Sequence, residues 1–322
     1  MKAYDARMKR SRIGLGSVVL LLACRHPVAG IGSPGQTTVV EPDAGGELAP
    51  ARTDDLTLAI DGHDRHLIIH WPGGSTTDPR PLVFNLHGSG GTAADQQAFS
   101  AMDPLAEAKG FIVAYADGAV PLGGGFAWNV PGQPLSGGGA VPPDAADDVA
   151  FFAQAIPLLA QRYAIDSRRI YATGMSGGGR MTSQLGCNLP ATFAAIAPVA
   201  GLRFPAPCGD DRAVPVVSFH GTADGTNPYG GGGPAYWTYS VPDALAMWGA
   251  HDGCGATPDV SPAGDGVTLT AYGGCTGGAA VALYTIDGAG HEWPGAPGQT
   301  PAIDAGAAMW TFFTNHPLPP AP

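Results

Sequence analysis

Positive charge is scarce in this sequence. Lysine occurs only as Lys2, Lys9 and Lys109, and 16 lysines and arginines stand against 27 aspartates and glutamates, so the formal net charge is −11 at pH 7. A protein that binds nucleic acid needs a basic surface to neutralise phosphates, and this composition excludes that class of partner. Charged residues make up only 13% of the chain, whereas hydrophobic residues make up 44%, which is ample for a buried core.

Apolar runs long enough to span a membrane are missing as well. The run over residues 13–23 follows a basic start and is too short for a transmembrane helix, but its length is typical of a signal peptide. It ends at Leu21-Leu22-Ala23-Cys24, which resembles the lipobox of bacterial lipoproteins. We predict an exported protein with a signal peptide over 1–23 and a lipid anchor on Cys24 as its sole contact with the membrane. The alternative is a plain signal peptide with an incidental cysteine.

The spacings of a metal site, CxxC and paired histidines, are absent too, so we expect no metal. Export permits disulfides, and four cysteines remain after Cys24. Four cysteines allow three connectivities. We favour Cys187–Cys208 and Cys254–Cys275, since each pair closes a separation of 21 residues.

What the chain does have is glycine and proline in abundance, gathered between apolar runs. Residues 25–53 lack periodicity and are predicted to be a flexible linker, which leaves 54–318 as a single domain. In that domain, apolar strands alternate with helices, a pattern that predicts an α/β fold with a mostly parallel sheet covered on both faces. We expect strands at 56–60, 65–71, 81–88, 111–118, 169–174, 193–201, 214–221 and 280–288, and helices at 93–109, 147–163 with a kink at Pro157, 178–187, 241–250 and 303–315.

Ligands of such sheets bind beyond the carboxyl ends of the strands, so the strand-to-helix turns are the places to search for chemistry. The turn at 174–178 has a G-x-S-x-G pattern around Ser176. A chance match is common in so glycine-rich a chain, and a glycine-rich loop is the alternative. The position between a strand and a helix favours a nucleophile elbow, in which Gly174 and Gly178 leave room where strand and helix approach.

A second turn, Leu86-His87-Gly88-Ser89-Gly90-Gly91, follows an early strand. In α/β-hydrolases the corresponding loop supplies one N–H of the oxyanion hole, and the residue after the nucleophile supplies the other. We assign these donors to Ser89 and Gly177. His87 precedes the nucleophile in the chain, whereas this fold places its catalytic histidine last, so we expect a structural role for His87.

A serine hydroxyl needs a histidine to take its proton and a carboxylate to orient that histidine. In this fold the order is serine, acid, histidine. Asp224 follows the strand 214–221, and His291 follows the strand 280–288, so we predict the triad Ser176, Asp224 and His291. The competing residues lie in less suitable places: Asp252, Asp265, Asp287, His220, His251 and His316.

These segments give the chain a family resemblance. "LHGSGG", "FAWN", "DDVAFF", "RIYATGMSGGG", "FAAIAPVAG", "HGTAD" and "GAGHEWPG" occur in this order between about 56 and 316. Together they resemble the polyhydroxybutyrate depolymerase and feruloyl/acetylxylan esterase family of α/β-hydrolases. The resemblance implies a secreted serine esterase without a cofactor, acting on polyester or on acyl groups of plant polysaccharides. Gly177 departs from the pattern, since members often have asparagine there. The alternatives are a noncatalytic surface lipoprotein that keeps the fold for binding, and a peptidase of the same fold.

Aromatic side chains near the predicted triad bear on the substrate. Trp128 and Asn129 lie in the long loop 118–146, and Trp293 follows His291. We predict that these three residues line the substrate pocket, because aromatic faces suit ferulate and sugar rings alike. The alternative is that the tryptophans pack the loops. The negative charge of the chain favours a neutral ester, and we expect a monomer.

Overall fold

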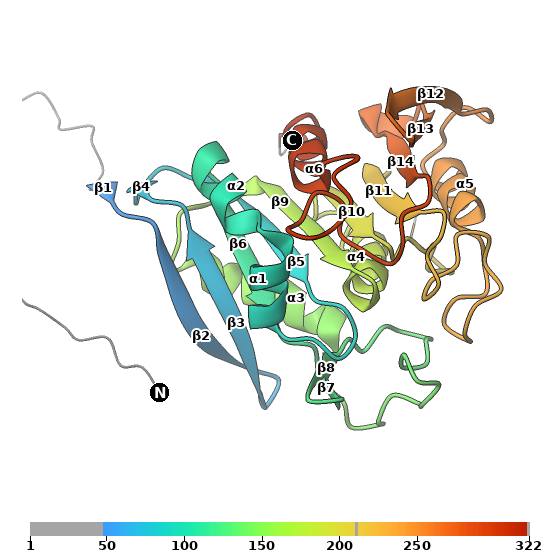
Figure 1. The fold of residues 1–322 in the computed structure, drawn as a ribbon. Helices are drawn as coiled ribbons and strands as arrows, with labels where there is room; N and C mark the ends of the chain where they lie inside the picture. Colours follow the sequence, from blue (N-terminus) through green and yellow to red (C-terminus); the bar gives the residue numbers. More distant parts are fainter. Residues whose placement is uncertain (1–47, 210–211, 321–322) are drawn as a thin grey trace, which may run out of the picture. The chain divides into compact units, whose positions relative to one another are not determined.

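A ten-stranded sheet runs through the centre of the protein, and helices cover both of its faces (Figure 1). The computed structural model describes residues 48–209 and 212–320, which belong to one compact unit. The strand order is β12-β13-β14-β11-β10-β9-β5-β6-β3-β2. The bounds of these strands are β2 Arg52–Ile60, β3 His63–Trp71, β5 Arg80–Leu86, β6 Ile112–Ala116, β9 Ile165–Met175, β10 Ala195–Val199, β11 Val216–Gly221, β12 Asp259–Gly264, β13 Val267–Tyr272 and β14 Val281–Ile286.

The six central strands, from β6 to β14, run parallel, and the two strands at each edge run antiparallel to their neighbours. The predicted α/β fold is therefore confirmed. The edge hairpin β12–β13 was not among the expected elements. Its strand β12 is exposed throughout, and its register with β13 shifts between Pro262 and Gly264.

Two layers of helices bury the faces of the sheet. One apolar cluster packs α3, α4 and α5 on one face, and a second cluster packs α1, α2 and α6 on the other. The helices are α1 Ala93–Ser100, α2 Met102–Lys109, α3 Asp148–Ala160, α4 Gly177–Asn188, α5 Val241–His251 and α6 Ala305–Thr314, with a 3-10 turn η1 at Thr276–Gly278. Among the described residues, none of the helices is both long and apolar enough to cross a membrane.

The helix expected over 93–109 is wrong in one respect, because it is two helices. Ala101 lies between α1 and α2 with φ 51°, a left-handed conformation. Pro104, within the first turn of α2, explains the break: in one continuous helix its ring would clash with the carbonyl of Ser100. Pro157, by contrast, lies inside α3, which continues past it to Ala160.

The folded part also begins earlier than expected. The short strand β1 (Leu48–Ala49) pairs with β4 (Gly74–Ser75), and β2 starts at Arg52, so the predicted linker over 25–53 overlaps two strands. The predicted signal peptide over 1–23, the lipidated Cys24 and residues 25–47 of the linker lie outside the described residues. Both favoured disulfides, Cys187–Cys208 and Cys254–Cys275, are present.

Candidate active site

Ser176 occupies the sharp turn between β9 and α4. Its backbone has φ 56° and ψ −112°. This conformation is energetically unfavourable for any residue that has a side chain, and such strain is concentrated at functional sites. The turn is held by the hydrogen bond from the Ser176 N–H to the Val199 carbonyl, at 2.9 Å. Because α4 begins at Gly177, the serine lies at the positive end of the helix dipole.

The glycines around Ser176 are required by close approach. A Cβ at Gly174 would lie 2.7 Å from the Cβ of Leu86, and a Cβ at Gly178 would lie 2.6 Å from the Leu86 carbonyl carbon. Neither position can hold a larger side chain unless β5 moves away from the turn. This is the steric role that the sequence predicted for the two glycines.

The two predicted oxyanion donors lie side by side. A Cβ at Gly177 would come within 3.0 Å of the Ser89 nitrogen, and a Cβ at Gly88 would lie 3.5 Å from the Cβ of Ser176. The loop after β5 therefore passes directly over the serine turn. The Ser89 nitrogen consequently lies beside Gly177, the residue that follows Ser176.

His87 supports this loop rather than the chemistry. The ring is buried, its Nδ1–H donates to the Gly88 carbonyl at 2.8 Å, and its Nε2 accepts the Gly118 N–H at 3.1 Å. Burial lowers its pKa, against the raising effect of the hydrogen bond to Gly88. A neutral histidine with both ring nitrogens engaged links two loops, in agreement with the expected structural role.

Asp224 and His291, the predicted acid and base, lie within hydrogen-bonding distance of each other. His291 Nδ1 lies 2.8 Å from Asp224 Oδ2, and the other carboxylate oxygen accepts the N–H groups of Thr226 and Asn227 at 2.8 and 2.7 Å. Burial would raise the pKa of Asp224, but the hydrogen bonds from His220, His291 and the Asn227 N–H hold it well below its usual range. The carboxylate is thus charged and fixed against the imidazole.

The candidate triad comes from three strand ends on one edge of the sheet. Ser176 follows β9, Asp224 follows β11 and His291 follows β14, all parallel strands. Within residues 48–209 and 212–320, no hydrogen bond joins Ser176 Oγ to His291. Catalytic hydrogen bonds of this kind are often long in the absence of substrate, so the shared strand edge and the Asp224–His291 bond carry the assignment.

The competing acids and histidines have other partners. His220 also reaches Asp224, at 3.3 Å, but its ring is fully buried and its Nε2–H donates to the Asn227 carbonyl at 2.8 Å. Asp252 is paired with His251 at 2.8 Å, beneath the start of β11. Both groups serve the fold, although His220 does so in direct contact with the candidate acid.

The three residues predicted to contact substrate all have contacts within the fold. Trp128 and Trp293 are 3% and 1% exposed and belong to the two apolar clusters. The Trp128 indole N–H donates to the His87 carbonyl at 2.8 Å, while Asn129 bonds Asp148 and Ala146. For both tryptophans the prediction is wrong, because side chains buried this deeply pack loops and present no face to a ligand.

Sequence reasoning missed Arg180, which lies one turn into α4 from Ser176. It is buried, and its guanidinium donates to Ser136 Oγ at 2.7 Å and to Ser89 Oγ at 3.3 Å. The signal available was its spacing, since a residue four positions after Ser176 lies on the same side of the helix as the serine. Ser136, in the loop 118–146, had no signal of its own.

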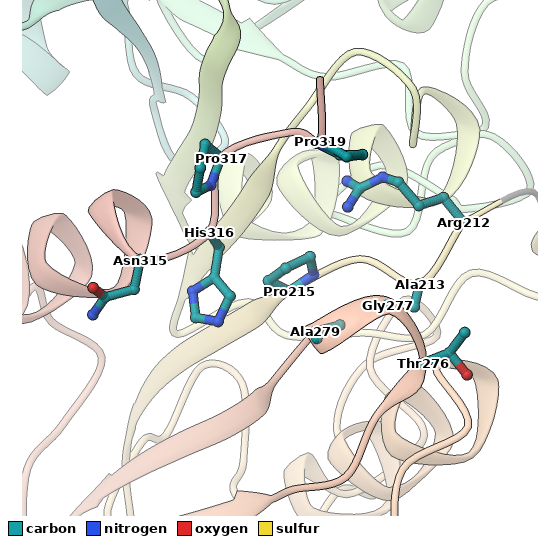
Figure 2. A pocket seen from close by; sticks show the side chains of 11 residues that line it. Arg212, Ala213, Pro215, Thr276, Gly277, Ala279, Asn315, His316, Pro317 and Pro319 are labelled. Carbon is teal, nitrogen blue, oxygen red and sulfur yellow. The ribbon is translucent and has the colours of Figure 1, made fainter. Parts of the chain in front are cut away.

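A separate cavity of 320 Å³ lies at the opposite ends of the central strands (Figure 2). Pro215 and Ala279 line it just before β11 and β14 begin, so it lies at the amino ends of the strands whose carboxyl ends lead to Asp224 and His291. Arg212 at its rim is engaged by the carbonyls of Pro190, Phe193 and Ala194. This cavity does not belong to the candidate triad.

In the part of the chain that the structure describes, no group of histidine, cysteine or acidic side chains is arranged to hold a metal ion.

A strained serine at a strand-to-helix turn of a mostly parallel sheet, with a histidine–aspartate pair at later strand ends, places the chain among the α/β-hydrolases. Solved structures agree on the fold. The acetyl xylan esterase from Aspergillus awamori matches with a TM-score of 0.56 at 19% identity, over 81% of this chain and 98% of that one.

The sequence comparisons match the resemblance seen in the sequence. The family model described as "Esterase PHB depolymerase" matches residues 66–224, which include Ser89, Ser176 and Asp224. Feruloyl esterase B of Piromyces equi is 32% identical over 79% of this chain, an alignment that spans 46% of that protein, and a putative esterase, NocK, of Nocardia uniformis subsp. tsuyamanensis is 28% identical over 89% of this chain and 90% of its own length. These matches confirm the resemblance seen in the sequence, and both relatives are named as esterases.

Proposed function

We propose that the protein is a serine esterase that hydrolyses carboxylic esters through an acyl-enzyme. The observation that carries the proposal is the Asp224–His291 hydrogen bond at 2.8 Å on the edge of the sheet where Ser176 sits in its strained turn. That edge supplies a nucleophile, a base and a group that orients the base.

Each residue has one task in the proposed reaction. His291 takes the proton of Ser176 as the hydroxyl attacks the ester carbonyl, and it returns a proton to the departing alcohol. The N–H groups of Ser89 and Gly177 stabilise the negative charge that develops on the carbonyl oxygen. Asp224 stabilises the imidazolium, and water, activated by His291, then releases the acid and frees Ser176.

For the substrate we propose an aromatic or acetyl ester of plant polysaccharide, or a hydroxybutyrate-type polyester. The feruloyl esterase of Piromyces equi supports the first class, and the description of the family supports the second. A panel of methyl ferulate, acetylated xylan and hydroxybutyrate oligomers separates these classes. The substrate with the highest kcat/KM identifies the class.

We also propose that the protein is exported. The two disulfides support this location, since such bonds persist in oxidising compartments. The predicted signal peptide over 1–23 and the lipid anchor on Cys24 are tested by mass spectrometry of the mature N-terminus. A thioether-linked lipid on Cys24 is the expected result. An unmodified cysteine would contradict the lipid anchor and would support export by a plain signal peptide.

The proposed mechanism is tested with Ser176→Ala. Hydrolysis of p-nitrophenyl acetate should fall by about 10⁴-fold or more, because the nucleophile is lost while the fold is kept. Wild-type enzyme mixed with a fluorophosphonate should become labelled on Ser176, as detected by mass spectrometry of peptides. Unchanged turnover in Ser176→Ala would contradict the mechanism. A wild type without turnover on any ester would instead support the noncatalytic binding protein, and cleavage of peptides alone would support the peptidase.

A further inference from the structure

Arg180 is a buried cation without an anionic partner. It is 3% exposed, and no carboxylate lies within 4.0 Å of it among the described residues. Its guanidinium stacks on the ring of Tyr236, with the central carbon 4.2 Å from the ring centroid, and its Nε is buried without a hydrogen-bond acceptor. A second buried arginine, Arg203, repels it.

Such an arrangement is costly for the folded state. A buried charge normally has a partner of opposite sign, because its removal from water is compensated only by strong local interactions. Arg180 has two serine hydroxyls and an aromatic face, which compensate a guanidinium only in part. Burial accordingly lowers its pKa, although a guanidinium remains protonated. The cost points to a function for the charge at this place.

The contacts of Arg180 join two loops that flank the candidate serine. One Nη2 group donates to Ser136 Oγ at 2.7 Å and to Ser89 Oγ at 3.3 Å, and Ser136 Oγ in turn donates to Ser89 Oγ at 2.7 Å. The three side chains therefore form a closed triangle. One corner is on α4, one is in the loop 118–146, and one is Ser89, whose N–H is the proposed oxyanion donor.

We propose that Arg180 is a positioning residue for the oxyanion hole. It holds the side chain of Ser89, and so aims the Ser89 N–H at the place where negative charge develops on the substrate carbonyl. The inference rests on the proposed esterase function and adds to it a residue whose side chain contacts Ser89 and Ser136 rather than the side chains of the triad. The uncompensated charge also favours the oxyanion through space, since no carboxylate nearby cancels it.

A double-mutant cycle tests the proposal. Arg180→Met removes the cation but keeps much of the apolar length, and Ser89→Ala removes the hydroxyl while keeping the backbone N–H. With p-nitrophenyl acetate, we expect Arg180→Met to lower kcat by about 10- to 100-fold and Ser89→Ala by about 5- to 10-fold, with KM changed by less than about threefold. The kcat of the double variant should lie within about twofold of the kcat of Arg180→Met, because both changes break the same contact.

Arg203→Met is the matched control. Arg203 is buried to a similar extent and bonds Gln184 at 2.8 Å, away from Ser89. It should change stability but alter kcat by less than about twofold. Arg180→Lys should recover part of kcat, since it restores the charge without the planar fork. Thermal unfolding of each variant shows that kcat is compared between folded proteins.

Three results would overturn the inference. The first is an unchanged kcat in a folded Arg180→Met. The second is a rise in KM at unchanged kcat, which is the signature of ground-state binding. The third is a double variant whose fold-loss in kcat equals the product of the two single fold-losses, because mutations at independent sites combine in this way. All three results require a wild type that hydrolyses the ester and a Ser176→Ala variant that does not. A failure of the proposed function would therefore show in these two proteins, before any Arg180 variant is compared.

Discussion

At the scale of single residues, Asp224 is the most heavily bonded group near the candidate site. Its carboxylate accepts from His291 and two backbone N–H groups, His220 Nε2 lies 3.3 Å from it, and it is 4% exposed. Three donors and a nearby histidine around one buried carboxylate favour its charged form strongly. His220 therefore belongs to the environment that keeps the acid ionised, although its own position in the chain, before the acid, excluded it as the base.

The low pKa of Asp224 predicts how stability changes with pH. A folded-state pKa below the unfolded value of about 3.9 means that the stabilisation is present above about pH 4 and is lost as pH falls below it. The free energy of unfolding of the wild type should therefore exceed that of Asp224→Asn most at pH 5, and the difference should shrink at pH 3. Urea unfolding at pH 5, 4 and 3 measures it.

The control for this measurement is Asp287→Asn. Asp287 is an exposed acid on the same edge of the sheet and bonds Thr222 at 3.0 Å. Its difference from wild type should be small at every pH. If the Asp224→Asn difference stayed constant from pH 5 to pH 3, the carboxylate would titrate alike in the folded and unfolded states, contrary to the prediction.

The residues that sequence could and could not predict differ in how far their contacts reach. Ser176, Asp224 and His291 could be predicted as a triad because each follows a strand in a fixed order, and strand order is visible as hydrophobic pattern. Arg180 was missed because its partners are 91 and 44 residues away, a proximity that depends on the path of two loops. Trp128 and Trp293 were misassigned because an aromatic beside a site looks alike in sequence whether it faces solvent or core.

At the scale of elements, the loop 118–146 is organised by Asp148 at the start of α3. Its fully buried carboxylate forms an ion pair with Arg65 and accepts the N–H groups of Ala119 and Asn129, at 3.2 and 2.7 Å. One side chain thus ties strand β3 to two points of the loop. Inside the loop, β7 (Val120–Leu122) and β8 (Gly125–Ala127) form a small hairpin.

Asp148→Ala should be strongly destabilising. It leaves the Arg65 charge buried and frees two backbone donors, so we expect a loss of about 3 to 5 kcal/mol in the free energy of unfolding. The neighbouring Asp147→Ala is the control, because Asp147 caps α3 at the surface and its removal should cost about 1 kcal/mol. Urea titrations followed by circular dichroism compare the two. Equal losses would show that Asp148 acts only as part of the helix end.

Predictability at this scale depends on local signals. In the sequence, two aspartates mark the N-terminus of α3, and Asp61-Gly62 marks the turn of the hairpin β2–β3, where its φ values are 52° and 79°. The break at Ala101 was missed because the apolar pattern continues across it. The hairpin β12–β13 was missed because an exposed edge strand shows little of the alternation that marks a half-buried one.

At the scale of the whole molecule, the two disulfides cross-link loops on one side of the sheet. Cys187–Cys208 joins the end of α4 to the chain after β10, and Cys254–Cys275 closes the segment that contains β12 and β13. Neither bond contacts a member of the candidate triad. Their contribution should therefore appear in stability rather than in turnover.

Removal of each disulfide by paired serine substitutions should lower the free energy of unfolding by about 3 kcal/mol, because each restores the freedom of a loop of similar length in the unfolded chain. Differential scanning calorimetry of the two double variants, with and without reductant, measures the effect. Reductant should lower the melting temperature of the wild type and leave a variant without either bond unchanged. A variant lacking Cys254–Cys275 should keep its kcat; a collapse of kcat there would contradict the separation of edge hairpin and active site.

The edge strand β12 also bears on how crowded copies of the protein behave. A sheet that is open at its sides invites a neighbouring chain to extend its hydrogen-bonded ladder, which is a route to aggregation. Pro262 has no N–H to offer in the middle of β12, and the register shift beside it interrupts the regular spacing of donors and acceptors. The opposite edge strand, β2, carries charge at Arg52, Asp54 and Asp55. The protein can thus keep ten strands in one sheet while both of its margins resist polymerisation.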